Sequence, residues 1–165
     1  MKIAVLSDSH DNIWKLEGAL EEAQEAEVWI HCGDLCAPFV VKQMGEGAQG
    51  RPVHVVWGNN DADARLICRI ASGFDDFHLH GQLAEITLGG RKIAVNHYPE
   101  IARPLAKSGD YDLVCYGHDH TRHLSQVGNT MLLNPGEIMG MKGPATIAMV
   151  DLKGMDVEFR EIPGR

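Results

Sequence analysis

The sequence lacks a long apolar segment and an N-terminal targeting signal. No uninterrupted apolar run approaches the ~20 residues that a membrane-spanning helix needs. Residues 1–8 have no separate charged, apolar and cleavage regions, as a signal peptide would, and instead predict a first β-strand. We therefore expect a cytoplasmic protein that has no membrane partner.

Cysteines are few, and Cys32, Cys36, Cys68 and Cys115 do not form a disulfide-like pattern. Cys32 and Cys36 are four positions apart and flank Asp34, so a thiolate metal site could form there. Small thiols packed beside a strand end are the simpler interpretation, because free cysteine behaves as a small hydrophobic side chain.

Positive charge is also scarce, with 15 Lys and Arg against 23 Asp and Glu and a formal net charge of −8. Binding to long nucleic acid needs a concentrated basic surface, whereas the basic residues here are scattered, so we expect no such partner. An acidic chain that handled phosphate would have to obtain positive charge from elsewhere, and bound cations could supply it.

A length of 165 residues and a hydrophobic content of 44% are typical of one folded domain, spanning residues 1–165. Five apolar runs rich in Val, Ile and aromatic residues predict buried strands at residues 2–6, 27–30, 53–57, 92–95 and 113–116. Helical stretches follow the first four, at residues 12–26, 37–44, 62–70 and 100–107. This alternation predicts an α/β architecture with a largely parallel central sheet.

Three hairpins are predicted where a glycine-containing pair separates two strand-like runs. The pairs are Gly89-Gly90, Gly128-Asn129 and Lys153-Gly154. So many hairpins in a short chain indicate a second sheet, mainly antiparallel or mixed. We therefore expect two sheets packed face to face, with helices outside.

Each of the five predicted strands is followed by residues of the kinds that bind metal ions. In chain order these residues lie in Asp8-Ser9-His10, Gly33-Asp34, Gly58-Asn59-Asn60-Asp61, Asn96-His97 and Gly117-His118-Asp119-His120. In open α/β sheets, sites form in the crevice outside the carboxyl ends of the strands. The pattern therefore predicts that these side chains converge.

The spacing within the motifs supports this prediction. Asp8 and His10 lie two apart, as do His118 and His120, so near a strand end both members of a pair can lean the same way. Carboxylate, imidazole and amide oxygen form a mixed nitrogen and oxygen set, which suits Mn²⁺, Fe, Zn²⁺, Ni²⁺ or Co²⁺.

Each motif alone is weak, because a single Gly-Asp or Gly-Asn usually marks a turn. Gly33 and Gly58 would permit tight backbone turns that point Asp34 and Asn59 into the crevice. It is the joint order of the motifs at successive strand ends that favours a metal site.

The motif set, in this order, resembles that of the calcineurin-like metallophosphoesterases, and the match spans almost the whole chain. The size and the Leu133-Asn134-Pro135-Gly136 segment are similar to those of the family's small single-domain bacterial and archaeal phosphodiesterases. The resemblance implies an α/β fold, a four-layer α/β/β/α sandwich of two mixed β-sheets flanked by helices, with a two-metal centre between the sheets.

The resemblance also implies a ligand set and a reaction. Asp34 would bridge two divalent ions, with Mn²⁺ favoured and Ni²⁺, Zn²⁺, Fe or Co²⁺ as alternatives. The remaining ligands would be Asp8, His10 and His120 for one ion, and Asn59, His97 and His118 for the other. A hydroxide held between ions ~3.5–4 Å apart would attack a small phosphoester, most plausibly a phosphodiester.

Asn59, Asn60 and Asp61 are the candidate catalytic residues, and Asn60 departs from the family pattern. Many larger members have a histidine there as a general acid, which asparagine cannot replace. We therefore expect esters with good leaving groups, because general acid catalysis is worth roughly 10²–10⁴ in rate. Asp61 is expected to orient its neighbours. Tyr98 is a second departure and would either line the pocket or pack.

Asn12 would either bind phosphate at the start of the first helix or cap that helix. The remaining histidines are expected outside the ligand set, and the three tryptophans in the core. These are His31, His54, His78, His80 and His123, and Trp14, Trp29 and Trp57.

The alternative to an enzyme is a non-catalytic, metal-binding scaffold for protein interactions, because the same fold has that role in a retromer subunit. All seven ligand positions are competent here, which favours the enzyme. A homo-oligomer is compatible with the sequence, which does not fix the oligomeric state.

Overall fold

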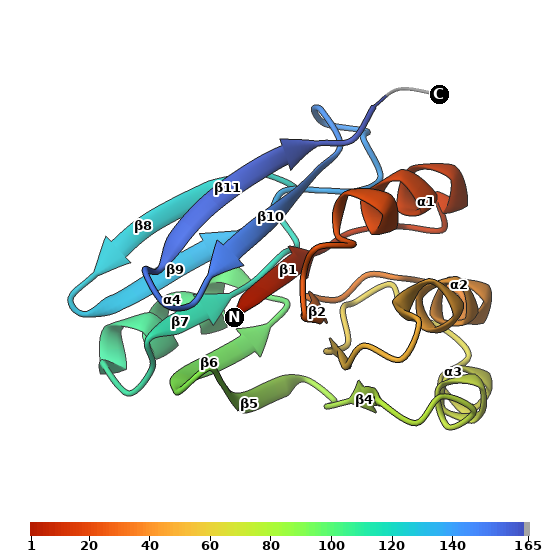
Figure 1. Cartoon of the computed structure of the whole chain (residues 1–165), viewed down its shortest axis with the longest axis horizontal. Helices are drawn as coiled ribbons and strands as arrows, with labels where there is room; N and C mark the ends of the chain where they lie inside the picture. Colours follow the sequence, from red (N-terminus) through yellow and green to blue (C-terminus); the bar gives the residue numbers. More distant parts are fainter. Residues whose placement is uncertain (164–165) are drawn as a thin grey trace.

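The computed structural model describes residues 1–163, which form two β-sheets between two layers of helices (Figure 1). The first sheet contains β1 (Lys2–Leu6), β2 (Val28–His31), β3 (Val53–Val55), β4 (Phe77–Leu79), β10 (Thr146–Asp151) and β11 (Asp156–Glu161). The second contains β5 (Leu83–Leu88), β6 (Arg91–Asn96), β7 (Leu113–Cys115), β8 (His123–Val127) and β9 (Thr130–Asn134). The helices are α1 (Ile13–Glu22), α2 (Pro38–Ala48), α3 (Ala64–Ala71) and α4 (Pro99–Ser108).

The first sheet has the strand order β11-β10-β1-β2-β3-β4. Strands β1 to β4 run parallel to one another, whereas β10 pairs with β1 in the antiparallel direction. Parallel neighbours place their carboxyl ends at the same edge of the sheet, so the loops after β1, β2 and β3 meet there.

The second sheet has the order β5-β6-β7-β9-β8, with β6, β7 and β9 parallel. The β5–β6 hairpin turns at Gly89 and Gly90, whose φ angles are 55° and 79°. Two consecutive residues with positive φ are what a tight two-residue hairpin turn requires. The loops after β6 and β7 leave the carboxyl ends of that parallel trio.

Three apolar clusters separate the four layers. One buries α1, α2 and α3 against the first sheet, with Leu16, Met44 and Ile67 fully buried. A second lies between the sheets, where Val5 and Ile93 are fully buried. The third packs α4 against the outer face of the second sheet. The predicted α/β/β/α sandwich of two mixed sheets is therefore confirmed.

Helix starts follow local sequence signals. The Asn12 side chain caps α1 by accepting a hydrogen bond from the Lys15 backbone N–H at 3.2 Å. Helices α2 and α4 both begin with a proline, which has no N–H to satisfy in the first turn. None of the helices in residues 1–163 is long and apolar enough to cross a membrane.

Several expectations need correction. The parallel strands are divided between two sheets, and the last hairpin, β10–β11, belongs to the first sheet. The short strand β4 was not predicted, because three residues are too few to show a period of two. Trp29 is in the core, as expected, and Trp57 packs partly buried against it. Trp14 is 65% exposed, so the prediction that it is a core residue is wrong.

Candidate metal centre

All seven predicted ligands lie in loops at the carboxyl ends of strands, where the two sheets meet. Strands β1, β2 and β3 of the first sheet lead to Asp8, His10, Asp34 and Asn59. Strands β6 and β7 of the second sheet lead to His97, His118 and His120. The centre is therefore assembled from both sheets.

The backbone at these positions is strained. Five of the seven predicted ligands have positive φ angles, between 42° and 73°. They are Asp8, His10, Asp34, His118 and His120. Residues with a Cβ rarely adopt this conformation, which costs on the order of 1–3 kcal/mol each and is concentrated at functional sites. The surrounding contacts hold these loops in this conformation, which is the kind of backbone strain found at functional sites.

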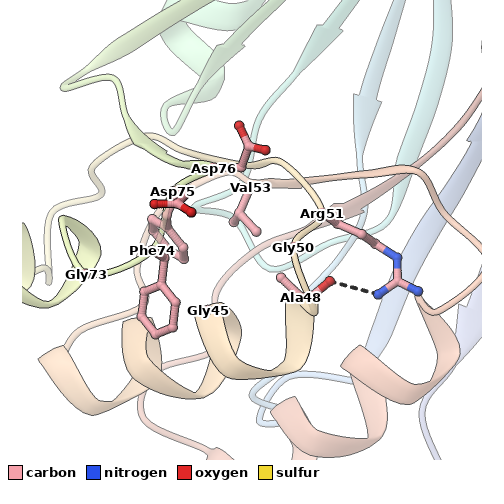
Figure 2. A pocket seen from close by; sticks show the side chains of 10 residues that line it. Gly45, Ala48, Gly50, Arg51, Val53, Gly73, Phe74, Asp75 and Asp76 are labelled. Carbon is pink, nitrogen blue, oxygen red and sulfur yellow. Dashed lines mark hydrogen bonds between the residues drawn. The ribbon is translucent and has the colours of Figure 1, made fainter.

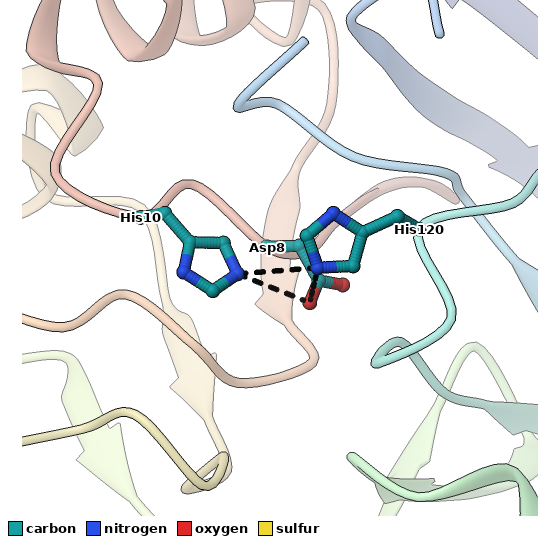
Figure 3. A group of neighbouring side chains, drawn as sticks. All are labelled: Asp8, His10 and His120. Atoms are coloured by element: carbon teal, nitrogen blue, oxygen red, sulfur yellow. Dashed lines mark hydrogen bonds and ion pairs between the residues drawn. The ribbon is translucent and has the colours of Figure 1, made fainter. Parts of the chain in front are cut away.

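One cluster of ligand atoms is formed by Asp8, His10 and His120 (Figure 3). Asp8 Oδ1 lies 3.7 Å from His10 Nε2 and 3.3 Å from His120 Nε2. The two Nε2 atoms are themselves 3.3 Å apart. All three donor atoms point toward one another, and a divalent cation accepts this combination of imidazole nitrogens and a carboxylate oxygen.

The two oxygens of Asp8 have different surroundings. Oδ2 accepts hydrogen bonds from Ser7 Oγ at 2.5 Å and from the His118 backbone N–H at 3.1 Å. Oδ1, which faces the imidazoles, is the buried side-chain polar atom that makes no hydrogen bond in the described residues. An unpartnered buried carboxylate oxygen is costly. A cation in the cluster would satisfy it, so these residues fit a metal ion.

A second cluster is formed by Asn59, His97 and His118. Asn59 Oδ1 lies 3.2 Å from His97 Nε2 and 2.9 Å from His118 Nδ1, and these two nitrogens are 3.2 Å apart. The set again combines imidazole nitrogens with an oxygen donor. His97, whose flanking sequence is the least distinctive, is fully buried within this group.

Asp34 lies between the two clusters. Its Oδ2 is 3.5 Å from His10 Nε2 and 3.4 Å from His97 Nε2. Burial acts to raise the pKa of Asp34, but His97 and two donors from Asn60 outweigh it, so the pKa lies below its usual value. The carboxylate is therefore ionised at neutral pH and faces both clusters at once.

Asn60 and Asp61 organise the loop around Asp34. The Asn60 backbone N–H donates to Asp34 Oδ1 at 2.8 Å, and its side-chain amide donates to Oδ2 at 2.7 Å. The Asp61 carboxylate accepts hydrogen bonds from the backbone N–H groups of Asp34, Cys36 and Gly58. Asp61 thus joins the loop after β2 to the loop after β3, which fits the orienting role predicted for it.

Three of the four histidines have a partner on the ring nitrogen that faces away from the clusters. His97 Nδ1 lies 2.8 Å from the Cys32 carbonyl oxygen, and His120 Nδ1 lies 2.6 Å from Glu137 Oε2. His10 Nδ1 lies 3.5 Å from the Cys36 thiol. A carbonyl or carboxylate can only accept, so it fixes the proton on Nδ1 and leaves Nε2 free to bind a metal ion.

Glu137 was missed by the sequence analysis. It is 1% exposed, and its second oxygen accepts backbone N–H groups of Lys142 and Gly143. Burial acts to raise the pKa of Glu137, but the contact with His120 and these donors lower it, so the carboxylate stays charged. Its position directly after Asn134-Pro135-Gly136 was the available signal, since that segment had already been singled out.

Glycines allow the close approach of the loops. Gly33 has a φ angle of 97°, as predicted for a tight turn. Gly58 is needed for a different reason: a Cβ there would lie 2.1 Å from Asp34 Oδ1 and 2.4 Å from the Asp34 backbone nitrogen. At Gly117 a Cβ would lie 2.0 Å from Ser7 Oγ and 2.6 Å from Asp8 Oδ2. The centre therefore excludes side chains at both positions.

The structure shows the surroundings of Asn12, Tyr98 and His31, which the sequence left open. The Asn12 side chain caps α1 and donates to the Met139 carbonyl at 3.0 Å, so its amide is engaged at the helix start. The Tyr98 ring packs against the imidazoles of His97 and His118, at centroid distances of 5.1 Å and 5.2 Å. His31 is buried behind the loops, where burial lowers its pKa to about 4.

Neither group of candidate ligand atoms found in residues 1–163 includes a cysteine. Cys32 is fully buried in the core between the sheets, and burial raises its pKa well above the usual value. Cys36 is half-buried, burial raises its pKa to about 12, and its thiol lies 3.5 Å from His10 Nδ1. Cys32 therefore packs as a small hydrophobic side chain beside a strand end, as the simpler of the two interpretations expects.

One cavity lies away from the clusters (Figure 2). It has a volume of about 310 Å³ and lies between the end of α2 and the segment that precedes β4. Figure 2 shows the Phe74 ring reaching down beside Gly45, and Arg51 turned back toward the Ala48 carbonyl. No predicted site residue lines it.

The chain is similar to known proteins over almost its whole length. A family model described as a calcineurin-like phosphoesterase superfamily domain matches residues 1–155. Phosphodiesterase MJ0936 of Methanocaldococcus jannaschii is 30% identical over 167 residues, covering 98% of each chain. The solved structure of an archaeal phosphodiesterase superposes with a TM-score of 0.90 at 27% identity, covering 98% of this chain and 99% of the other.

A more distant neighbour shares the fold alone. Vps29 from Entamoeba histolytica, solved with zinc, superposes with a TM-score of 0.69 at 18% identity. The match covers 99% of this chain and 100% of that one.

Proposed function

Because the chain belongs to the calcineurin-like phosphoesterase superfamily, we propose that it is a metal-dependent phosphodiesterase that hydrolyses a small phosphoester at a centre of two divalent ions. The ions that suit the mixed donor set are Mn²⁺, which we favour, and Ni²⁺, Zn²⁺, Fe and Co²⁺. The cytoplasmic location expected from the sequence is part of the same proposal.

We propose that the two clusters are the two ion sites and that Asp34 bridges them. Asp8, His10 and His120 would hold one ion, and Asn59, His97 and His118 would hold the other. The distances of 3.4 Å and 3.5 Å from Asp34 Oδ2 to a histidine of each cluster support the bridge. When bound, such a pair of ions lowers the pKa of water and neutralises charge on the phosphate oxygens.

The protein residues around the clusters would hold the ligands in place rather than react. Asn60 donates two hydrogen bonds to Asp34 and fixes the plane of its carboxylate. Asp61 holds the backbone of Asp34 and of the turn at Gly58, so it is a positioning residue. For Asn12 the proposal remains phosphate contact through the start of α1, where backbone N–H groups favour anions.

Asn60 also bears on the substrate. Its amide carries no proton that it can give to a leaving group near neutral pH, and it already donates to Asp34 at 2.7 Å. The leaving group of the substrate therefore has to depart without a proton from a general acid at this position. Diesters with good leaving groups fit that requirement, since the missing acid would otherwise cost roughly 10²–10⁴ in rate.

The single observation that carries the proposal is the buried Asp8 Oδ1. It makes no hydrogen bond with any part of residues 1–163, although it is fully buried and lies within 3.7 Å of two imidazoles. If the site only packed the two sheets together, that buried oxygen would lack a hydrogen-bond partner, which costs about 1–3 kcal/mol. A bound cation removes the cost.

The test is a matrix of metals and substrates on metal-depleted protein. A phosphodiester, a phosphomonoester and a cyclic nucleotide would each be assayed with Mn²⁺, Ni²⁺, Zn²⁺ and Mg²⁺. We expect turnover of the diester with a transition metal and loss of both metal and activity in Asp34→Asn. The control is Asp110→Asn, an exposed carboxylate on the loop before β7.

Two outcomes would contradict the proposal. Full activity of Asp34→Asn would show that the shared carboxylate does not hold ions. Metal binding by the wild-type protein without turnover of any substrate would favour the scaffold function instead.

A further inference from the structure

Three histidines that the metal centre does not use lie together at the edge of the first sheet. His54 is in the middle of β3, and His78 is its direct neighbour on β4 in the parallel register. His80 follows β4 immediately. We propose that these three residues, here called the edge histidine cluster, form a separate binding site for one late transition-metal ion such as Zn²⁺, Ni²⁺ or Cu²⁺.

The alternation of strand residues places these side chains on one face. Val53, Val55, Phe77 and Leu79 point into the core beneath the helices. Side chains of successive strand residues point to opposite faces, so His54 and His78 face away from that core, with His80 beside them. By the same alternation Asp76 shares their face, and Figure 2 shows its carboxylate directed away from the Phe74 ring.

The imidazoles are in direct contact. His54 Nδ1 lies 2.8 Å from His80 Nε2, and the His54 and His78 rings stack with centroids 4.8 Å apart. In the metal centre, the ligand nitrogens of His10 and His120 and of His97 and His118 approach to 3.3 Å and 3.2 Å. Zn–N distances of ~2.0–2.1 Å in a tetrahedral site place two nitrogens about 3.3 Å apart. His54 and His80 need to separate by only about half an ångström to accept an ion.

His78 completes the set by turning. Its Nε2 lies 3.7 Å from Asp76 Oδ1, and its side chain is 43% exposed. A half-exposed imidazole at a strand edge can change rotamer without disturbing the core. Three imidazoles would then surround the ion, with the Asp76 carboxylate close enough to neutralise part of its charge.

The protonation state suits metal binding. Burial, together with the neighbouring His80 and His78, lowers the pKa of His54 to about 4, and burial also lowers the pKa of His80. Metal ions bind neutral imidazole, so neither ring has to release a proton to solvent near pH 7. The proton that His54 Nδ1 and His80 Nε2 share in their hydrogen bond would move to the other nitrogen of its own ring when the ion binds. Sites made mainly of imidazole favour zinc, copper and nickel over magnesium or calcium.

Occupation of the cluster would have a structural consequence. Strand β4 has only three residues and is the edge of the sheet, so β3 is its sole strand partner there. An ion held by His54 on β3 and by His78 on β4 would cross-link the two strands. This edge of the sheet is also linked to the candidate metal centre. The Trp57 backbone N–H donates to the Gly81 carbonyl at 2.8 Å, and Trp57 directly precedes Gly58.

The test is a zinc count on metal-depleted full-length protein. Wild type, His78→Gln/His80→Gln and the control His123→Gln would be dialysed against buffered Zn²⁺ and analysed for bound metal. His123 is exposed on β8, in the other sheet. We expect the double variant to bind one equivalent fewer than wild type, the control to bind the same number, and Mn²⁺-dependent turnover to be unchanged in both.

A second measurement does not depend on folding of the double variant. The imidazole nitrogen resonances of His54, His78 and His80 would be followed by NMR during Zn²⁺ titration of Asp8→Asn, in which the metal centre is weakened. Shifts of these signals with saturation at one equivalent support the proposal. Unmoved signals, or equal zinc counts for wild type and double variant, would show a hydrogen-bonded cluster that binds no metal.

Discussion

Replacement of Glu137 by glutamine should weaken one of the two metal sites. The carboxylate lies 2.6 Å from His120 Nδ1 and also accepts backbone N–H groups of Lys142 and Gly143. Glutamine has the same shape but only one acceptor oxygen. If that oxygen stays with the backbone donors, its NH₂ group faces His120 Nδ1. The imidazole must then carry its proton on Nε2, where it would point at Asp8 instead of binding metal.

The expected magnitude follows from the geometry and burial. Partners that fix the tautomer of a metal-binding histidine are typically worth 10- to 100-fold in metal affinity, or about 1.4–2.7 kcal/mol. Hydrogen bonds to a buried charged group contribute about 1.5–3 kcal/mol to stability, and Glu137 is 1% exposed. The metal-free Glu137→Gln protein should therefore also unfold at a lower denaturant concentration.

The loss should be confined to one ion. His120 belongs to the cluster with Asp8 and His10, whereas within residues 1–163 no hydrogen bond or ion pair joins the Glu137 side chain to Asn59, His97 or His118. Competition with a chelator, or calorimetric titration of metal-depleted protein, resolves two binding steps. We expect one step to weaken 10- to 100-fold and the other to stay within twofold of wild type.

Glu46→Gln is the matched control, since Glu46 lies on α2 with its side chain 62% exposed. It should leave both binding steps unchanged. The reasoning would be refuted if Glu137→Gln bound both ions as tightly as wild type, because His120 would then not depend on its carboxylate partner. Equal weakening of both steps would also refute it, since it would indicate a general collapse of the loops.

Asn60→His should raise turnover of diesters with poor leaving groups relative to good ones, up to the roughly 10²–10⁴ of a general acid; an unchanged ratio would contradict the leaving-group account. Gly58→Ala should lower stability by about 1–3 kcal/mol and remove most activity, because its Cβ meets Asp34, whereas Gly143→Ala, with open space, should fold normally. The pKa of His31 is lowered to about 4 by burial, so the unfolded chain, with a pKa near 6.5, binds more protons below about pH 6.5. The unfolding free energy should therefore fall by up to about 3 kcal/mol between pH 6.5 and pH 4. An NMR titration that showed His31 protonating near pH 6.5 would contradict this.

Much of the fold could be predicted because the sequence carries strong periodic signals. Strand β1 was predicted at its observed bounds, and the hairpin turns at Gly89 and Gly128 were predicted from their glycines. Element ends were less predictable: the first helix ends at Glu22, four residues before its expected end. Helix ends depend on where the chain leaves the core, and local composition does not record that.

The candidate metal centre could also be predicted only in part. The seven proposed ligands could be selected from residue type at successive strand ends, because the carboxyl ends of parallel strands are brought together by the sheet itself. The partners of these side chains on the side that faces away from the clusters could not be predicted from the sequence. The contact between His120 and Glu137, 17 positions apart, depends on how the loop before β10 packs against the loop after β1, where Ile138 and Met139 donate backbone hydrogen bonds to Ser7 and Asp8.

Sequence alone therefore determined which side chains are of metal-binding type and in what order they follow the strands. Both are properties of local composition and strand period. Only the tertiary structure decided which of them face one another, which oxygen of Asp8 is left without a hydrogen bond and which buried carboxylate fixes His120. It also decided that the imidazoles of His54 and His80 meet at 2.8 Å. These are contacts between segments distant in the chain, and their geometry is set by the packing of two sheets rather than by any local preference of the backbone.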